Sequence, residues 1–205
     1  MSTLRCLVTG GMGFIGSYTC QALREVGCEV VAYDILTEGN TFDRSQHPSE
    51  REGLVIEAGD VLDRERLEAA MRRHGIDTVV HLAAILTAES FVDPVLATRV
   101  NCEGTASVFE AARRVGVRRV VWASSISVWY GLAPFPHDRE VSNDHPHCPD
   151  DVYGASKAFD EWLGKVYGHH FGLQNIGLRF AHGTGAGRTR GGGAWARELV
   201  DKPAL

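Results

Sequence analysis

Tyr153 and Lys157 stand four residues apart in an amphipathic stretch, a spacing that places both side chains on one face of a helix. A lysine ammonium beside a phenol favours the phenolate, so the pair could act as a general base. Ser125 ends an earlier apolar run, and its hydroxyl could hold a substrate oxygen beside the tyrosine. Taken alone, the pair could equally be an ordinary aromatic and a solvated cation.

A glycine-rich turn spans residues 10–16, between a short apolar run and an amphipathic stretch. Without side chains at Gly11 and Gly13 the backbone can turn sharply and approach phosphates, while Gly16 allows close packing of helix on strand. Asp34 ends the next apolar run. Its carboxylate could accept hydrogen bonds from an adenosine ribose and would repel a 2′-phosphate, which favours NAD over NADP. The alternative is a structural turn followed by an exposed aspartate.

These residues need a scaffold that brings the ends of several strands together. Apolar runs alternate with helical patterns, and this rhythm predicts an α/β fold, a Rossmann-type doubly wound parallel sheet with helices on both faces. Val95, Leu96, Val100, Phe109 and Val115 predict one buried helix face. The expected strands are 4–9, 29–34, 54–58, 77–82, 118–123 and 175–179, and the expected helices are 13–26, 63–74, 92–115 and 153–170.

Composition and charge limit the classes of binding partner that we expect for the chain. The 205 residues carry a formal net charge of −5 with the two signs interspersed, which argues against a nucleic-acid or anionic-membrane surface and favours a small-molecule ligand. The five cysteines include no C-x-x-C pair, as expected in a reducing compartment. No leader pattern precedes the first strand, and no apolar segment approaches the about 20 residues that cross a bilayer. We therefore expect a soluble, cytoplasmic protein.

One loop gathers His137, His145, His147 and Cys148. Their spacing matches no familiar zinc module, so the sequence favours a solvated polar loop over a metal site. No metal is predicted.

Further motifs follow in a specific order along residues 4–187. They are Thr9-Gly10-Gly11-Met12-Gly13-Phe14-Ile15-Gly16, Gly59-Asp60-Val61, His81-Leu82-Ala83-Ala84, Asn101 in Val100-Asn101-Cys102-Glu103-Gly104-Thr105, Ser124-Ser125, and Tyr153-Gly154-Ala155-Ser156-Lys157. With these motifs the sequence resembles the extended short-chain dehydrogenase/reductases, the NAD-dependent epimerase/dehydratase family that includes UDP-glucose 4-epimerase.

The resemblance implies roles for these positions. Tyr153 would be the catalytic base, Ser125 the partner of the substrate oxygen, and Lys157 the contact to the nicotinamide ribose, while Asn101 would be structural. NAD is the implied cofactor. The implied cofactor-binding residues are Gly10, Gly13, Phe14, Ile15, Gly16, Asp34, Asp60, Val61, Leu82, Ala83, Ala84, Tyr153 and Lys157.

Ile126 and Ser127 stand where related dehydratases carry an Asp-Glu pair and related decarboxylases a glutamate. Neither can move a proton as a carboxylate does, so the resemblance favours simple hydride transfer at a carbinol carbon by an epimerase or a dehydrogenase. A nucleotide sugar such as a UDP-sugar is the expected substrate. Two alternatives stay open: a dinucleotide-binding module with little activity, and an NADP-dependent carbonyl reductase of the same fold.

The resemblance also predicts how the chain is divided. Residues 1–180 would form the NAD-binding Rossmann domain, and 181–205 the start of an incomplete substrate-binding lobe. Segment 178–185 departs from the family pattern by lacking its asparagine and proline. A homodimer is expected, with the helices 92–115 and 153–170 pairing as a four-helix bundle.

Overall fold

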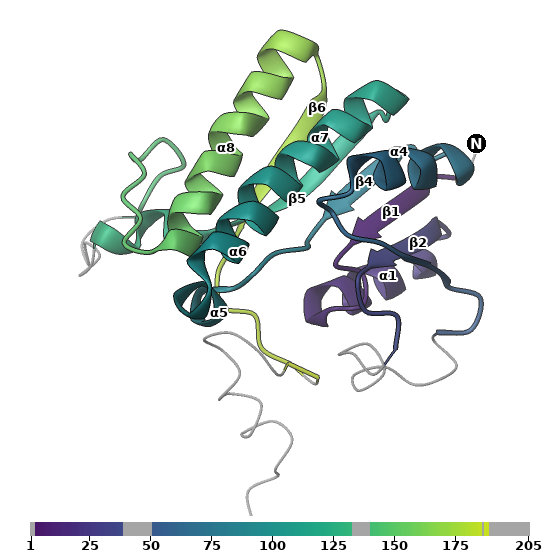
Figure 1. The fold of residues 1–205 in the computed structure, drawn as a ribbon, viewed down its shortest axis with the longest axis horizontal. Coiled ribbons are helices and arrows are strands. Elements are labelled where there is room, and N and C mark those ends of the chain that lie inside the picture. Colours follow the sequence, from purple (N-terminus) through teal and green to yellow (C-terminus); the bar gives the residue numbers. More distant parts are fainter. Residues whose placement is uncertain (1–2, 39–50, 133–139, 186, 189–205) are drawn as a thin grey trace, which may run out of the picture.

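The computed structural model describes residues 3–38, 51–132, 140–185, 187 and 188, and within them a parallel sheet forms the centre of the molecule (Figure 1). Its six strands lie in the order β3-β2-β1-β4-β5-β6, and every neighbouring pair is parallel. This is the Rossmann order, so the predicted fold class is confirmed. The strands are β1 (Arg5–Thr9), β2 (Glu29–Asp34), β3 (Val55–Ala58), β4 (Thr78–His81), β5 (Arg119–Ser125) and β6 (Gln174–Phe180).

Helices cover both faces of the sheet. On one face α4 (Arg64–Arg73), α7 (Gly104–Val115) and α8 (Val152–Phe171) lie side by side in Figure 1, and α1 (Phe14–Glu25) packs on the other. Successive strand residues point to opposite faces, so Leu7 joins the core beneath α4 and α7 while Val8 joins the core beneath α1.

The predicted strands lie within two residues of the observed ones, and three of the four predicted helices are equally close. Asp63 caps α4 as expected, accepting a hydrogen bond from the Arg66 amide at 3.0 Å. Gly27 and Gly116, which the sequence placed at helix ends, adopt positive φ angles of 85° and 82°. These are conformations that glycine reaches without a steric penalty.

The predicted helix over 92–115 is observed as an unbroken helical run over 94–115, but a π-helical turn interrupts it and a separate short helix precedes it. A short helix, α5 (Thr87–Val92), comes first, and α6 (Pro94–Thr98) follows, with Asp93 accepting from the Leu96 amide at 2.9 Å. A π-helical turn, Arg99–Glu103, then joins α6 to α7. Such turns occur mainly as single interruptions of α-helices and often lie at functional sites.

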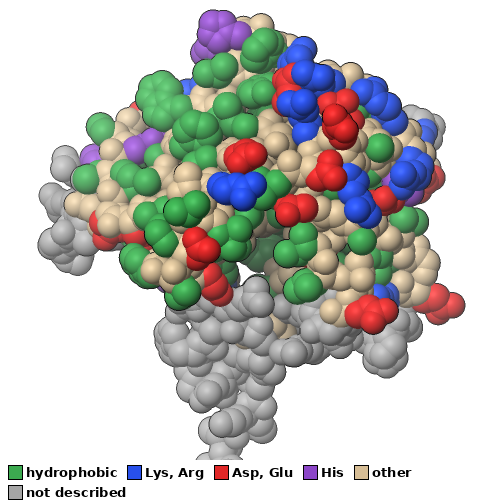
Figure 2. All heavy atoms as spheres, in the orientation of Figure 1, with side chains coloured by type: hydrophobic (Ala, Val, Ile, Leu, Met, Phe, Trp, Pro, Cys, Tyr) green, Lys and Arg blue, Asp and Glu red, His purple; other side chains and the backbone are tan. Residues whose placement is uncertain are grey.

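The prediction that the apolar residues of this helix form one buried face is partly wrong. Phe109 is fully buried, but Val95 and Leu96 are 69% and 42% exposed. In Figure 2 apolar side chains gather over the half of the view that holds α5, α6 and α8, whereas charged side chains gather over α4 and the adjoining end of α7. The sheet contributes exposed apolar groups as well, because Ile176 and Leu178 on β6 point away from α8.

No helix within the described ranges is both long enough and apolar enough to span a membrane.

Gly16 tests how tightly α1 packs on the glycine turn. A Cβ at this position would overlap the Gly10 carbonyl oxygen and approach Gly11 Cα to 2.8 Å. We expect Gly16→Ala to lower the free energy of unfolding by about 1–3 kcal/mol, the usual cost of overpacking. The measurement is urea denaturation. Gly168→Ala is the control: its Cβ would meet nothing closer than 3.5 Å, so it should raise the free energy of unfolding by about 0.5–1 kcal/mol. A Gly16→Ala protein as stable as wild type would contradict the packing argument.

Candidate functional site

The glycine turn lies at the carboxyl end of β1, pressed between neighbouring strands. Gly10 has φ 68°, donates to the Tyr33 carbonyl at 2.9 Å, and leaves no room for a side chain against the Ala83 amide. Gly13 is the N-terminal cap residue of α1. It has no side chain, and within the described residues no side-chain capping bond is made at this end of the helix. The first amides of α1 are therefore available to an anion, as a dinucleotide pyrophosphate requires.

Asp34 connects the end of β2 to this turn. Its Oδ2 accepts from the Met12 amide at 3.0 Å and its Oδ1 from the Leu36 amide at 3.1 Å. Burial raises the pKa of the Asp34 carboxyl above its ordinary value, although the Leu36 and Met12 amides act in the opposite direction. Each oxygen retains a lone pair for a ribose hydroxyl, so the residue fits the predicted contact.

The remaining predicted cofactor residues line the same edge. Asp60 follows β3, where its carbonyl accepts from the Tyr33 hydroxyl at 3.1 Å and its Oδ1 from the Leu62 amide at 2.9 Å. The Val61 side chain is buried in the core, so Val61 could reach a cofactor only through its backbone. Residues 82–84 follow β4, and the Leu82 amide bonds the carbonyl of Thr9 at the base of the glycine turn.

His81 ends β4 inside a buried chain of hydrogen bonds. Its Nδ1 lies 2.6 Å from Thr9 Oγ1 and its Nε2 lies 3.1 Å from Thr105 Oγ1. The Thr105 hydroxyl in turn donates to the Asn101 carbonyl at 2.5 Å. This direction assigns the ring proton to Nε2. Burial lowers the pKa of His81 to about 3, and the nearby Lys157 acts the same way, so the ring is neutral and structural.

Asn101 lies on the π-helical turn and is fully buried. Its amide accepts from the Ile85 amide at 2.8 Å and donates to the Ile85 carbonyl at 3.0 Å. It also donates to Ser156 Oγ at 3.1 Å. Ser156 donates to the Tyr153 carbonyl at 2.7 Å. Asn101 therefore ties the loop after β4 to the first turn of α8, which agrees with the supporting role implied by the resemblance.

Tyr153 and Lys157 lie on one face of α8, as predicted. The lysine nitrogen stands 5.9 Å from the centre of the Tyr153 ring. The lysine is almost fully buried and pairs with Asp160, whose carboxyl oxygen lies 3.3 Å away. Sequence reasoning did not identify Asp160, although its i, i+3 position relative to Lys157 was a usable signal.

Ser125 and Tyr153 both line a cavity of about 210 Å³ at the carboxyl edge of β5 and β6. Ser125 Oγ donates to Ser127 Oγ at 3.0 Å and accepts from the Ser127 amide at 3.1 Å, which fixes its orientation. Tyr130 and Arg188 line the same cavity. The three predicted catalytic residues thus come from β5 and α8. Ser125 and Tyr153 line one cavity, and Lys157 is buried one helical turn beyond Tyr153.

A second polar cluster anchors α8 to the sheet. Glu161 accepts from Ser124 Oγ at 2.6 Å and from Arg179 at 2.7 and 2.6 Å. His147 Nε2 lies 2.9 Å from the second Glu161 oxygen. Although burial raises it, the hydrogen bonds from Arg179 and Ser124 hold the pKa of Glu161 below its ordinary value.

This cluster corrects the interpretation of the histidine-containing loop as solvated. His147 packs into the Glu161 cluster, with its side chain only 15% exposed. His137 lies outside the described residues. Among the residues that are described, no group of three metal-binding side chains occurs.

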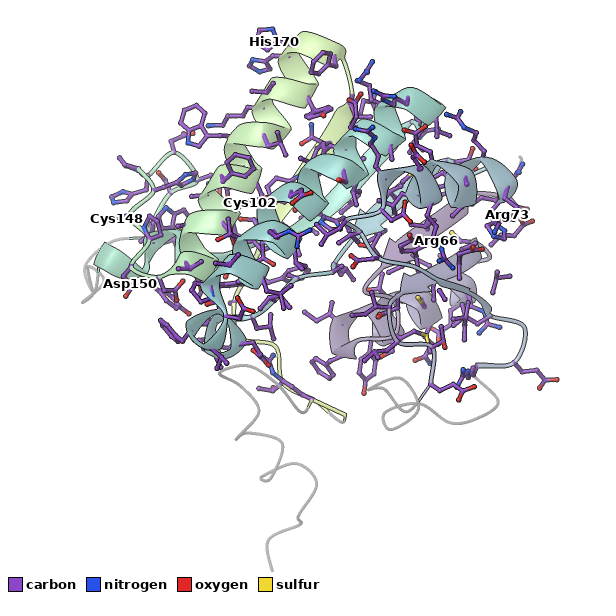
Figure 3. The ribbon with its side chains drawn as sticks, viewed as in Figure 1. Arg66, Arg73, Cys102, Cys148, Asp150 and His170 are labelled. Atoms are coloured by element: carbon purple, nitrogen blue, oxygen red, sulfur yellow. The ribbon has the colours of Figure 1, made fainter. Side chains whose placement is uncertain are left out.

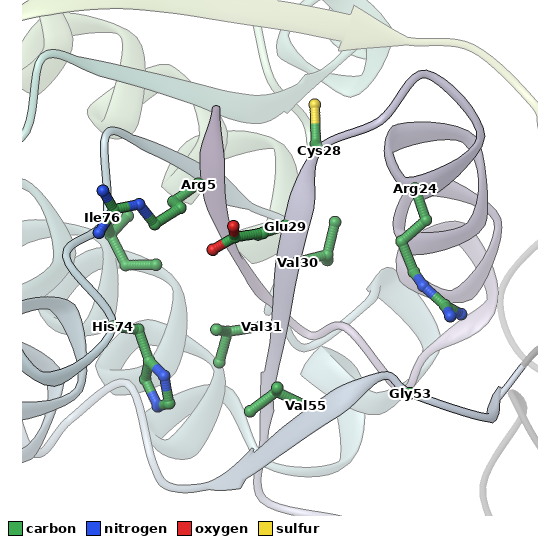
Figure 4. Close-up of a pocket in the computed structure, with 10 residues that line it drawn as sticks. All are labelled: Arg5, Arg24, Cys28, Glu29, Val30, Val31, Gly53, Val55, His74 and Ile76. Carbon is green, nitrogen blue, oxygen red and sulfur yellow. The ribbon is translucent and has the colours of Figure 1, made fainter. Parts of the chain in front are cut away.

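A larger cavity, about 390 Å³, opens at the opposite edge of the sheet (Figure 4). Arg5, Glu29 and Val55, which begin β1, β2 and β3, line it together with His74. Ligands of open parallel sheets bind at the carboxyl ends of the strands. The larger cavity is therefore separate from the candidate site.

Fold and site define a Rossmann-type α/β protein with a glycine turn after its first strand and a paired tyrosine and lysine. The family model described as "NAD dependent epimerase/dehydratase family" matches residues 6–200, so the chain belongs to that family. The chain is 34% identical over 187 residues to a UDP-glucose 4-epimerase of Rhizobium meliloti, covering 91% of this chain and 54% of the relative.

Solved structures give the same result. A UDP-glucose 4-epimerase from Brucella ovis, in complex with NAD, superposes with a TM-score of 0.77 at 30% identity, covering 90% of this chain and 54% of that one. An L-threonine dehydrogenase from Clostridium difficile gives a TM-score of 0.76 at 28% identity, covering 88% and 54%. The chain spans about half the length of the relatives it matches.

Glu161→Gln tests the anchoring cluster. A carboxyl whose pKa is lowered by folding stabilises the fold above its unfolded pKa, about 4.3, and loses this contribution as the pH falls. At pH 7 we expect Glu161→Gln to lower the free energy of unfolding by about 1–3 kcal/mol, since Arg179 loses its counter-charge. The difference from wild type should shrink below about pH 4.

Urea denaturation from pH 3 to pH 8 measures this effect. The control is Glu25→Gln, at an exposed position on α1. Its free energy of unfolding should stay within about 0.5 kcal/mol of wild type. A Glu161→Gln deficit that is independent of pH would show that the carboxylate charge does not stabilise the cluster.

Proposed function

We propose that the chain binds NAD across the carboxyl edge of its sheet and supports hydride transfer at a carbinol carbon of a nucleotide sugar. One observation carries the proposal. Ser125 and Tyr153 line the same cavity, and Lys157 lies behind Tyr153. Lys157 itself is buried on α8, while the glycine turn follows β1 and Asp34 ends β2 at the carboxyl edge of the sheet.

Each side chain has a defined task in this proposal. Tyr153 takes the proton of the substrate hydroxyl, and Lys157 holds its ammonium nitrogen 5.9 Å from the centre of the Tyr153 ring. Ser125, oriented by Ser127, holds the substrate oxygen in hydrogen-bond reach of the phenol. Ile126 and Ser127 supply no carboxylate for an elimination, which keeps the proposed chemistry to proton and hydride transfer.

The proposed cofactor sites follow the strand ends. The amides at the start of α1 would bind the pyrophosphate, Asp34 the adenosine ribose, and Lys157 the nicotinamide ribose. When bound, NAD supplies a hydride acceptor at the substrate carbon. Asp34 supports NAD over NADP, because its carboxylate could accept hydrogen bonds from the ribose hydroxyls and would repel a 2′-phosphate.

Epimerase and dehydrogenase activities remain alternatives within the proposal, because both use the same proton and hydride steps. Names of the matched relatives include UDP-glucose 4-epimerases and L-threonine dehydrogenases. A UDP-hexose is the first substrate to test, and L-threonine the second. A dinucleotide-binding module with little activity is the competing function.

Calorimetry and turnover separate these functions. We expect NAD to bind at least tenfold more tightly than NADP, with Asp34→Ala reducing that preference. Tyr153→Phe removes the proton acceptor and should lower turnover of UDP-glucose or UDP-galactose by about 10²-fold or more, with NAD binding retained. Tyr130→Phe, on the same cavity, is the control and should lose less than tenfold.

Three outcomes would count against the proposal. Binding of NAD without turnover of either sugar nucleotide or L-threonine would favour the binding module. A tenfold preference for NADPH would favour the carbonyl reductase. Equal losses in the two tyrosine variants would remove Tyr153 from the role of base.

We also propose a homodimer through α5, α6 and α8. Phe159, Trp162 and Val166 form an exposed apolar stripe along α8 at helical spacing, and α5 and α6 contact α8 while exposing Val95. Contiguous apolar surface of this kind is typical of protein interfaces. The exposed large apolar residues on the three helices are Phe91, Val92, Val95, Leu96, Phe159, Trp162, Val166 and Phe171.

Val95→Glu tests the dimer, since a charge at this 69% exposed position should not disturb the monomer. We expect the wild type to sediment as a dimer at micromolar concentration and Val95→Glu as a monomer with an unchanged melting temperature. Val26→Glu, 76% exposed at the end of α1, is the control and should remain dimeric. A monomeric wild type would refute the dimer.

A further inference from the structure

Asp160 lies nearly one turn beyond Lys157 on α8, and both side chains are buried. Lys157 Nζ stands 3.3 Å from Asp160 Oδ2, and the side chains are 3% and 0% exposed. Removing two charges from water is unfavourable unless they pair closely, so each ion is stabilised by the other.

The second carboxyl oxygen of Asp160 is available to accept a proton. Oδ1 is buried and has no hydrogen-bond partner among the residues that the structure describes. Thr105 lies near enough to favour the carboxylate, yet its hydroxyl donates to the Asn101 carbonyl at 2.5 Å. One oxygen therefore holds the lysine, and the other can accept a proton.

The titratable groups around Asp160 keep their protonation states in the pH range in which Asp160 takes up a proton. Burial raises the pKa of Asp160 to about 6, while Lys157 opposes this rise and Glu161 on the same helix adds to it. Burial also raises the pKa of Cys102, on the adjoining π-helical turn (Figure 3), to about 11, so its thiol is neutral. Across from Lys157, His81 on β4 is neutral because its pKa is lowered to about 3.

We propose that Asp160 is a positioning residue for Lys157, holding its ammonium beside the Tyr153 ring while ionised and releasing it when protonated. The proposal rests on the proposed function, in which Lys157 holds its ammonium near Tyr153 and contacts the nicotinamide ribose. Asp160 touches neither substrate nor cofactor there, and it acts only through the lysine.

The physical effect follows from the lysine side chain. Its stem has several rotatable bonds, so an ion pair at its tip removes conformations that would carry the ammonium away from Tyr153. A protonated Asp160 cancels the counter-charge and leaves a buried ammonium that is no longer restrained. Cofactor affinity and turnover should therefore both respond to a single proton on Asp160.

The first experiment uses the wild-type chain and needs no turnover. Carbon-13 resonances of the Asp160 carboxyl and the Lys157 side chain are assigned through their backbone correlations and followed from pH 4 to pH 8. We expect the Asp160 signal to titrate near pH 6 and the Lys157 signal to shift with the same midpoint. A Lys157 signal that stays flat while Asp160 titrates, or an Asp160 that does not titrate in this range, overturns the proposal.

The second experiment uses Asp160→Asn, which keeps the shape of the side chain and removes its charge. We expect kcat to fall at least tenfold with KM for the sugar nucleotide within twofold, and the acid limb near pH 6 to disappear from the kcat profile. Wild-type affinity for NAD should fall several-fold more between pH 7.5 and 5.5 than that of Asp160→Asn. This difference separates Asp160 from Asp34, which is present in both proteins.

The matched control is Asp63→Asn, the same chemical change at the cap of α4, where asparagine caps equally well. It should leave kcat, its pH profile and NAD affinity unchanged. An Asp160→Asn protein with the wild-type pH profile and the wild-type loss of NAD affinity overturns the proposal. If the wild type turns over no substrate, the proposed function fails, while the NMR titration still decides the role of Asp160.

Discussion

A continuous chain of buried hydrogen bonds joins the glycine turn to the helix that carries Tyr153 and Lys157. It runs from Thr9 through His81 and Thr105 to Asn101, and from there to Ser156. Buried polar groups are costly when they lack partners, so no member can move without leaving another unsatisfied. The proposed cofactor edge and the proposed catalytic helix are therefore positioned by one network, and the rest of the site depends on it.

The sheet could be predicted from the sequence because strands covered on both faces are nearly continuous apolar runs. The π-helical turn within the helix over 92–115 could not. The spacing of apolar residues in this helix does not predict the hydrogen bonds that Asn101 makes to the backbone of Ile85. These bonds accompany the π-helical turn. The spacing also placed Val95 and Leu96 in the core, since periodicity identifies an apolar stripe without showing what covers it.

The parts of the site that were predicted depend on local spacing. Tyr153 and Lys157 share a face because they are four residues apart, and the glycine turn needs only its own residues and the adjoining strand. The contacts of Glu161 with Ser124, His147 and Arg179 were missed, because they join separate elements across the fold. Polar residues in loops and on helices look solvated until their neighbours in space are known.

Asp160 and Glu161 show why the environment, and not the residue type, decides how a carboxyl behaves. Neighbouring positions on a helix point about 100° apart, so the two side chains meet different surroundings. Both are desolvated, but Glu161 gains several hydrogen bonds to its charged form and its pKa falls, whereas Asp160 gains one ion pair and its pKa rises. The face of α8 toward Arg179 therefore holds a permanent charge that anchors the helix. The face toward Lys157 holds the buried carboxyl of Asp160, whose pKa burial raises to about 6.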